Sequence, residues 1–226
     1  MEKLFNSFGI NITEKQLELF DKYYRLLIEY NGRFNITAIT EKQEVYLKHF
    51  VDSLLFVDKL NCENLIDVGS GGGFPAIPIK IFKEDIRVTL VEATGKKCEF
   101  LQAVVDNLNL SGVKVINGRA EDLAKKEEFR EKFDACSARA VARLNTLCEY
   151  CMPFVKVGGK FYAFKGNAEE EVLEAKNAVK ILGGKIKNVI SSDLSGAVRT
   201  LIEIEKIGKT ASKYPRGNGK ERKNPL

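Results

Sequence analysis

The stretch Asp67-Val68-Gly69-Ser70-Gly71-Gly72-Gly73-Phe74 decides the fold class of this 226-residue chain. An apolar run that begins at Leu65 leads into it and predicts a strand, and Pro75 after it suits the first turn of a helix. A strand, a glycine-rich turn and a helix in this order let the backbone approach a bound nucleotide closely. Glycines alone do not identify the nucleotide, so the neighbouring residues have to.

The chain beyond this stretch alternates between strand and helix patterns. The predicted strands cover residues 65–68, 86–91, 113–116, 133–136 and 160–164, and the predicted helices lie near residues 76–82, 96–108, 120–132, 142–152 and 168–182. This alternation predicts a doubly wound, mostly parallel α/β sheet. Two further strands, 186–191 and 198–204, follow without a helix between them and are expected to form an antiparallel edge, which makes a seven-stranded sheet. We assign residues 63–208 to this domain.

The first 62 residues have a helical pattern instead. Thr13 and Gln16 have the spacing of a helix capping box, and an apolar stripe with a helical period follows as far as Asn31–Gly32. A second amphipathic stretch covers residues 45–60. Residues 1–62 are therefore predicted to form an N-terminal helical cap.

The net charge is concentrated at the C-terminal end of the chain. Residues 209–226 hold six basic residues and one acidic residue, which accounts for the whole net charge of +5. Because this segment also contains two prolines and two glycines, it is predicted to be a mobile tail outside any core. Its charge suits a polyanion such as RNA. A solvated terminus without a partner explains the charge equally well.

Composition also bounds the compartment and the metal content. No segment has the ~18 unbroken apolar residues that a membrane helix needs, and the N-terminus lacks the layout of a signal peptide. We expect a monomeric, cytoplasmic protein with no membrane partner. Cys148 and Cys151 form a CxxC pair, but no second pair or paired histidines complete a zinc site. We therefore expect buried thiols and no metal.

Two residues of the glycine stretch favour one nucleotide ligand over the others. A dinucleotide fingerprint would have a third glycine where Phe74 stands. A phenyl ring crowds a pyrophosphate, but it can pack against an adenosine or a methionine moiety. Asp67 would repel phosphates, whereas it can attract the ammonium and sulfonium groups of S-adenosylmethionine. The predicted cofactor is S-adenosylmethionine.

Acidic residues after the next two strands agree with this cofactor. Glu92 ends the second predicted strand 23 residues after Gly69, close to the ~20 expected of a carboxylate that accepts the ribose hydroxyls. Glu121 lies in the turn after the third strand, where the adenine edge would be. The alternative is that Glu92 and Glu121 are solvated loop carboxylates. The fold class is therefore predicted as a Rossmann-like, class I S-adenosylmethionine-dependent methyltransferase.

The methyl acceptor is less well defined by the residues. The Asn/Asp-Pro-Pro-aromatic segment used on base amines and the Pro-Cys nucleophile used on pyrimidine C5 are both missing. The side chains that remain near the predicted site are cationic: Arg119, Arg139, Arg143 and Lys165. Guanine N7 fits this inventory, because its lone pair needs no deprotonation before it attacks. A methyltransferase with a small-molecule acceptor and a non-catalytic nucleotide-binding module remain open.

Several motifs together resemble one known family. They are Asn31-Gly-Arg-Phe-Asn35-Ile-Thr37, His49-Phe-Val-Asp52-Ser53-Leu54, Asp67 to Pro75, Gly118-Arg-Ala-Glu121, Ser137-Ala-Arg139-Ala-Val-Ala, Ala163-Phe-Lys165-Gly166 and Lys213-Tyr-Pro-Arg216. In this order, over nearly the whole chain, they resemble the small-subunit ribosomal RNA guanine-N7 methyltransferases, formerly called glucose-inhibited division protein B. The resemblance implies methylation of N7 of one guanine in bacterial 16S ribosomal RNA, either as free RNA or in the small ribosomal subunit.

The resemblance also implies roles for individual residues. The implied cofactor contacts are Gly69, Phe74, Ala120, Glu121 and Arg139, and the glycine turn and the acid after the second strand add Gly71 and Glu92 to this predicted set. Arg139 is further implied to lie at the target base, and Lys165 matches a basic position near the catalytic pocket. Glu92 stands where the family often has Asp, and its longer side chain could still reach the ribose. His49 is three residues from Asp52 and could form an acid/base pair with it, but a structural role is favoured because N7 needs no base.

Overall fold

The computed structural model describes residues 1–226 and contains one seven-stranded sheet with the strand order β3-β2-β1-β4-β5-β7-β6. The strands are β1 (Asn64–Val68), β2 (Arg87–Glu92), β3 (Val113–Asn117), β4 (Phe133–Arg139), β5 (Val155–Lys165), β6 (Gly184–Leu194) and β7 (Ala197–Lys206). Strands β1 to β5 are parallel, and β7 is antiparallel to both β5 and β6. The predicted class, strand number and antiparallel edge are confirmed.

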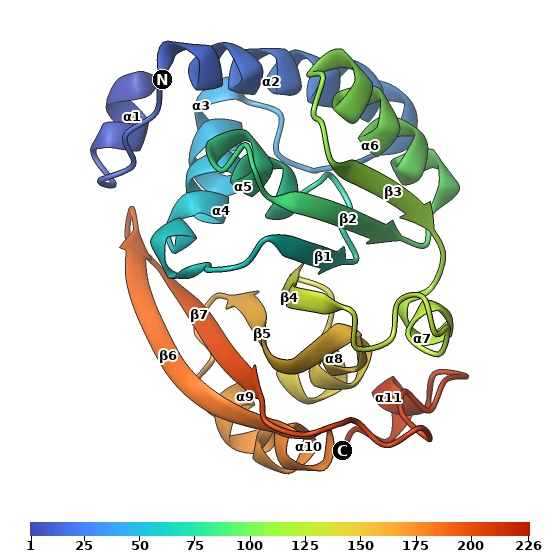
Figure 1. Cartoon of the computed structure of the whole chain (residues 1–226). Helices are drawn as coiled ribbons and strands as arrows, with labels where there is room; N and C mark the ends of the chain where they lie inside the picture. Colours follow the sequence, from blue (N-terminus) through green and yellow to red (C-terminus); the bar gives the residue numbers. More distant parts are fainter.

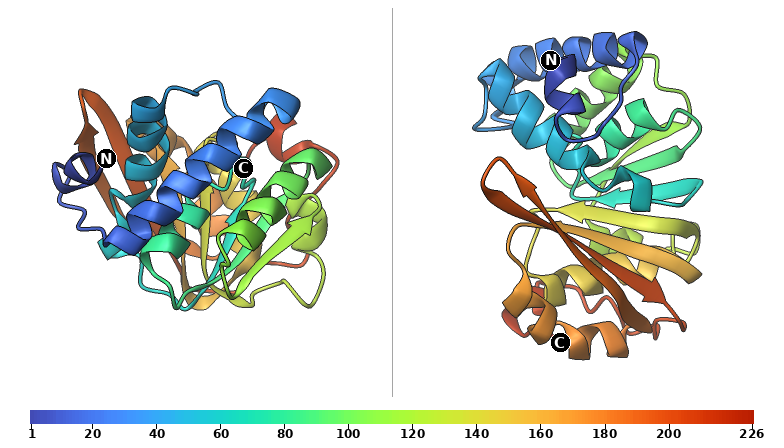
Figure 2. Two further views of the ribbon diagram at one scale, coloured as in Figure 1. Left: turned by 90° about the horizontal axis from the view of Figure 1, so that it is seen from above. Right: turned by 90° about the vertical axis from the view of Figure 1, so that its left-hand side faces the viewer.

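Helices cover both faces of this sheet (Figures 1 and 2). One face carries α1 (Glu2–Asn6), α2 (Glu14–Phe34), α3 (Lys42–Val45), α4 (Asp52–Leu54), α5 (Ala76–Phe82) and α6 (Gly95–Asn107), and the other carries α8 (Leu144–Cys151), α9 (Glu169–Glu174) and α10 (Lys176–Ile181). The short α7 (Ala120–Leu123) and α11 (Lys220–Lys223) lie at the right-hand side of Figure 1. None of these helices combines the length and the hydropathy that a membrane crossing needs.

The helical cap forms as its sequence predicts. The Thr13 hydroxyl accepts from the Gln16 amide while the Gln16 side chain accepts from the Thr13 amide, so the capping box at the start of α2 is complete. Asn35 ends this helix in the left-handed conformation. Between α3 and α4 the chain makes a π-helical turn, Tyr46–Val51, and a 3-10 turn over Val57–Lys59 follows.

Two apolar cores hold the layers together. The cap and the sheet share the first core, in which Phe20 and Phe50 from the cap join Ile77 and Leu90 from the sheet domain. The second core lies on the other face, under α8 and α10. The boundary at residue 62 therefore marks a change of secondary structure, whereas the apolar packing continues across it.

Two of the predicted helices are shorter in the structure. The helix predicted over 120–132 ends at Leu123, because the following residues form turns in which Arg130 donates to the carbonyl of Ala124. The helix predicted over 168–182 is divided between α9 and α10 at Ala175. Strand β5 extends further than the pattern 160–164, because its first residues continue the pairing with β4 around a bulge.

The C-terminal segment, residues 209–226, differs most from its prediction as a mobile tail without a core. Tyr214 and Glu221 are buried, and the Arg216 guanidinium forms an ion pair of 2.7 Å with Glu149, which is fully buried on α8. The basic composition suggested a solvated segment, but the body of the protein supplies the carboxylate that Arg216 needs. This segment lies against the domain, close to α8 (Figure 1).

Candidate functional site

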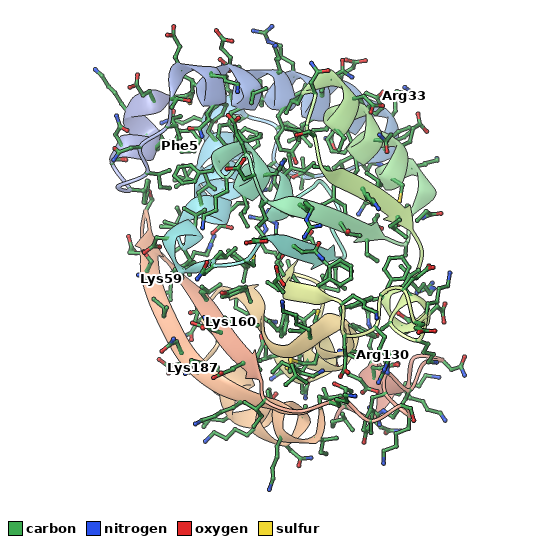
Figure 3. All side chains as sticks on the ribbon, viewed as in Figure 1. Phe5, Arg33, Lys59, Arg130, Lys160 and Lys187 are labelled. Carbon is green, nitrogen blue, oxygen red and sulfur yellow. The ribbon has the colours of Figure 1, made fainter.

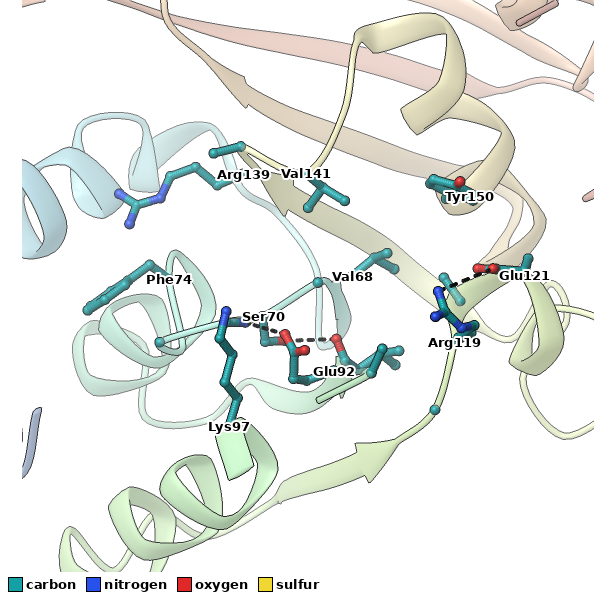
Figure 4. Close-up of a pocket in the computed structure, with 18 of the residues that line it drawn as sticks. Val68, Ser70, Phe74, Glu92, Lys97, Arg119, Glu121, Arg139, Val141 and Tyr150 are labelled. Carbon is teal, nitrogen blue, oxygen red and sulfur yellow. Dashed lines mark hydrogen bonds and ion pairs between the residues drawn. The ribbon is translucent and has the colours of Figure 1, made fainter. Parts of the chain in front are cut away.

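A cavity of about 810 Å³ opens where the parallel strands end. The glycine stretch after β1, Glu92 at the end of β2, the turn after β3 and Arg139 at the end of β4 all line it (Figure 4). Ligands in doubly wound folds bind at this edge of the sheet, and the volume suits a nucleotide-sized molecule. The structure thus brings together Gly69, Gly71, Phe74, Glu92, Ala120, Glu121 and Arg139 around one cavity.

Glu92 fixes the glycine stretch from the neighbouring strand. One carboxylate oxygen accepts from the Gly71 amide at 2.9 Å and the other from the Thr94 amide at 2.8 Å. Glu92 lines the cavity and each of its oxygens has a further lone pair, so this carboxylate can still accept from a hydroxyl of a ligand. Its position fits the ribose contact predicted from the sequence, and that role stays a prediction.

We expect Glu92→Ala to weaken the binding of S-adenosylmethionine by about 1–3 kcal/mol, because hydrogen bonds to a charged acceptor are lost. Titration calorimetry of the wild type and the variant measures this change directly. Asp122→Ala is the matched control. It also removes a carboxylate that lines the cavity, but Asp122 is not predicted to contact the ribose. An unchanged affinity for Glu92→Ala would refute the ribose assignment.

Asp67 does not contact the cavity as the sequence suggested. Its side chain is fully buried in β1 and absent from the cavity lining, and one oxygen accepts from the Ser137 hydroxyl at 2.6 Å while the other has no partner. Burial raises the pKa of Asp67 to about 7, although the hydrogen bond from Ser137 and the charge of Arg139 act to lower it. Asp67 therefore cannot contact a cofactor in the cavity directly. Its carboxyl group is partly protonated near neutral pH.

This raised pKa predicts that the free energy of unfolding depends on pH. Between about pH 4 and pH 7 the folded protein holds a proton on Asp67 that the unfolded chain has lost, so the free energy of unfolding falls as the pH rises. His49, with a folded pKa of about 4, acts in the opposite direction between pH 4 and about 6.5.

Urea unfolding of the wild type and Asp67→Asn separates the two groups. The stability of the wild type relative to the variant should fall from pH 4 to pH 7 and then level off, because only Asp67 differs between them. A difference that does not change with pH would mean that Asp67 is an ordinary carboxylic acid.

A network of charged and aromatic side chains closes one end of the cavity. The Arg139 guanidinium donates to Asp52 at 2.7 Å and lies 5.1 Å from the centre of the Phe74 ring (Figure 4). Asp52 accepts a second bond of 2.7 Å from Arg199, on β7. The His49 ring stacks on Phe74 at 4.5 Å. Arg139 is thus held between the carboxylate of Asp52 and the face of the Phe74 ring, and Arg199 fixes that carboxylate from β7.

His49 uses both ring nitrogens within this network. Its Nδ1 lies 3.1 Å from the Lys48 carbonyl and 3.5 Å from the Arg139 guanidinium, and its Nε2 lies 2.8 Å from the Thr37 hydroxyl. Burial and the nearby charge of Arg139 lower the pKa of His49 to about 4, so the ring is neutral at pH 7. Its bonds fit the structural role predicted for it.

Lys165 lies beside a second cavity of about 320 Å³ that adjoins the first through His49, Arg139 and Ala140. Its ammonium donates to Glu171 at 2.7 Å and to the Ala142 carbonyl at 2.6 Å, and only 9% of the side chain is exposed. Lys165 therefore braces the chain just after Arg139. The structure gives it the contacts of a positioning residue, while its catalytic role stays a prediction.

The other two cations named from the sequence lie apart from this network. Arg143 forms an exposed ion pair with Glu174 and lines neither cavity. Arg119 lines the far end of the first cavity, beside Glu121 (Figure 4).

Several cavity residues had no signal that sequence reasoning used. They are Thr37, Lys97, Tyr150, Asn218, Gly219 and Arg222 at the first cavity, and Arg199 at the second. Thr37 stands inside a quoted motif, so that motif pointed to its region without assigning the contact. No group of three or more His, Cys, Asp and Glu side chains is placed to hold a metal ion, and Cys148 and Cys151 are buried thiols on α8.

Solved structures support the fold. The chain resembles a methyltransferase from Aquifex aeolicus described as dependent on S-adenosylmethionine, with a TM-score of 0.57 and 15% identity over 75% of this chain and 96% of that one. It also resembles the M. jannaschii TYW2 structure in complex with AdoMet, with a TM-score of 0.58 and 16% identity over 75% of this chain and 80% of the other. The class I methyltransferase fold is confirmed.

Sequence relatives are much closer than these structures. The ribosomal RNA small subunit methyltransferase G of Pelotomaculum thermopropionicum is 48% identical over 96% of this chain and 94% of its own length. The protein of the same name from Leuconostoc mesenteroides is 45% identical over 98% of this chain and 95% of its own length. The profile of the family described as GidB, rRNA small subunit methyltransferase G, matches residues 16–202. With the cavity, the fold and these matches together, the chain belongs to the rRNA small subunit methyltransferase G family.

Proposed function

We propose that this protein transfers a methyl group from S-adenosylmethionine to N7 of a guanine in small-subunit (16S) ribosomal RNA. The observation that carries the proposal is the state of the acid and base groups around the second cavity. Asp52 is bonded to two arginines, Glu171 to Lys165, and both nitrogens of His49 have partners. No free base stands ready to deprotonate an acceptor.

The first cavity suits the cofactor along its whole length (Figure 4). Phe74 and Arg139 stand at one end, Glu92 lies between, and Glu121 stands at the other, which matches a methionine part, a ribose and an adenine. Lys97 on α6 adds a cation that can bind the carboxylate of the methionine part. S-adenosylmethionine supplies an electrophilic methyl group on its sulfonium.

The acceptor therefore has to bring its own lone pair. Guanine N7 does so, since it is an acceptor in the neutral base and needs no proton removed. The task left to the protein is to hold the base and exclude water, which is catalysis by orientation. Phe56 and Phe164 provide apolar surface in the second cavity, while Arg139 and Arg199 offer donors that can bind O6 or a phosphate.

The two cavities meet at the residues that this mechanism needs. His49, Arg139 and Ala140 line both, so a base in the second cavity would face the methionine end of the first. Lys165 holds the Ala142 carbonyl just beyond this junction. We assign Arg139 to contact with cofactor and base, and Lys165 to the position of the chain between them. Action as a monomer in the cytoplasm stays a prediction.

The acceptor class is tested with labelled S-adenosylmethionine and a panel of acceptors. Unmodified 16S RNA or small ribosomal subunits should take up label, whereas a fragment of 23S RNA and free guanosine should not. Transfer to a small molecule with no transfer to either form of small-subunit RNA would support the alternative of a small-molecule methyltransferase. Tight cofactor binding without transfer to any acceptor would support a binding module.

A further inference from the structure

The C-terminal segment reaches the cofactor cavity, although its sequence suggested a tail for RNA. Asn218, Gly219 and Arg222 line the cavity together with Glu121 after β3 and Tyr150 on α8. In Figure 4, Glu121 and Tyr150 stand at the end opposite Phe74 and Arg139. The segment therefore borders the half of the cavity that the proposed function gives to adenosine.

Arg222 is a close neighbour of both residues at this end. Burial raises the pKa of the Tyr150 hydroxyl, and the charges of Arg222 and Glu121 act on it in opposite directions. The three side chains thus surround one space from α11, α7 and α8. Arg222 is exposed and lines the cavity beside the Tyr150 hydroxyl, so a ring placed in that space would lie next to its planar guanidinium.

Several anchors fix the segment in this position. The Arg130 guanidinium (Figure 3) donates to the carbonyls of Thr210, Ala211 and Tyr214. Further along, the Arg216 guanidinium forms its ion pair with the buried Glu149. The backbone N–H of Arg216 also donates to Glu149 at 2.8 Å. These contacts at two places make the segment an ordered part of the domain.

The short helix α11 is anchored as well. Glu221 is fully buried and accepts from the Gly217 amide, while its own carbonyl accepts from the Thr146 hydroxyl at 2.9 Å. Glu221 therefore faces α8, its neighbour Arg222 faces the cavity, and Lys223 is exposed outside the cavity lining. Arg222 can therefore be compared with its neighbour Lys223, which is also basic and exposed but does not line the cavity.

We propose that residues 216–222 form one wall of the adenosine half of the cofactor cavity, and that Arg222 and Asn218 bind the cofactor there. A guanidinium plane stacks well on a purine ring, and an Asn amide can both donate to and accept from the adenine edge. The C-terminal segment thus serves cofactor binding. This inference rests on the proposed function for the orientation of the cofactor.

The test measures cofactor binding by calorimetry in the absence of RNA. Arg222→Ala should raise the Kd for S-adenosylmethionine roughly three- to tenfold, the size of a lost polar contact, and Asn218→Ala should raise it by a similar or smaller factor. Lys223→Ala is the matched control, one residue away with the same loss of charge, and should leave this Kd unchanged. Both Arg222 and Lys223 are exposed, so neither substitution removes a core contact.

A second ligand shows which part of the cofactor is involved. 5′-Methylthioadenosine contains the adenosine but lacks the amino-acid portion, so Arg222→Ala should weaken it by the same factor as S-adenosylmethionine. Adenine is uncharged, so the factor should persist when salt is raised from 0.1 to 0.5 M, whereas a contact with RNA phosphate would be screened.

Two outcomes would overturn the inference. One is equal cofactor affinity for the wild type, Arg222→Ala and Asn218→Ala. The other is a defect of Arg222→Ala confined to RNA binding and equal to that of Lys223→Ala. Methyl transfer by the wild type is measured separately. A wrong proposed function is thereby distinguished from a wrong assignment of residues 216–222 to cofactor binding.

Discussion

Arg139→Ala is expected to lower the rate of methyl transfer to small-subunit RNA by about a hundredfold or more. Arg139 joins Asp52 to the face of Phe74 at the junction of the two cavities, so its loss misplaces both the cofactor and the acceptor. Misalignment of reacting groups by about 1 Å can cost this much. Single-turnover rates with saturating cofactor and RNA measure the effect on the chemical step.

The control for Arg139→Ala is Arg143→Ala. Arg143 is four residues further along, lines neither cavity and pairs with the exposed Glu174, so its loss should leave cofactor affinity unchanged. Arg139→Lys keeps the charge but loses the planar fork, and it should recover only part of the rate. A rate for Arg139→Ala within a few-fold of the wild type would mean that the ion pair with Asp52 only stabilises the fold.

Gly73→Ala is expected to destabilise the protein by about 3 kcal/mol or more. Gly73 has a φ of +88°, and a Cβ built there would stand 2.5 Å from the Tyr23 hydroxyl and 2.6 Å from Ile77 Cδ1. Tyr23 cannot withdraw easily, since it is fully buried and its hydroxyl donates to the Gly72 carbonyl. Backbone strain and overpacking therefore add at one position. Urea unfolding measures the change.

Gly158→Ala separates these two costs. Gly158 has a φ of +85° but no atom within 4 Å of a built Cβ, so only the backbone strain of about 1–2 kcal/mol is expected. Equal destabilisation at the two positions would show that the close approach of Tyr23 and Ile77 to the glycine stretch has no cost.

The order of the elements could be predicted from the sequence because it depends on local patterns. An apolar run predicts each strand. The residues that follow a parallel strand lie at the edge of the sheet where ligands bind. Gly69, Glu92, Glu121 and Arg139 were found in this way, and all four line the cavity. The capping box of α2 needed only three residues of spacing.

The rest depended on pairings between distant residues, to which a local pattern is blind. Arg199 on β7 meets Asp52 in the cap only after the sheet has formed. Glu149 lies within the helix predicted near residues 142–152, and its ion pair with Arg216 fixes the segment around Arg216 in place. For Asp67 the charge was visible in the sequence, but its complete burial was not.

The identity of the methylated atom distinguishes guanine N7 from every acceptor that has to lose a proton. Small-subunit RNA methylated by the wild-type protein with labelled S-adenosylmethionine can be digested to nucleosides and separated by chromatography with mass detection. We predict that all of the label is in 7-methylguanosine, at one position of the 16S sequence, because the paired carboxylates and the neutral, doubly bonded His49 leave no base for an acceptor that has to lose a proton. Label in a nucleoside methylated at an amine or a hydroxyl would contradict it, since such an acceptor has to lose a proton.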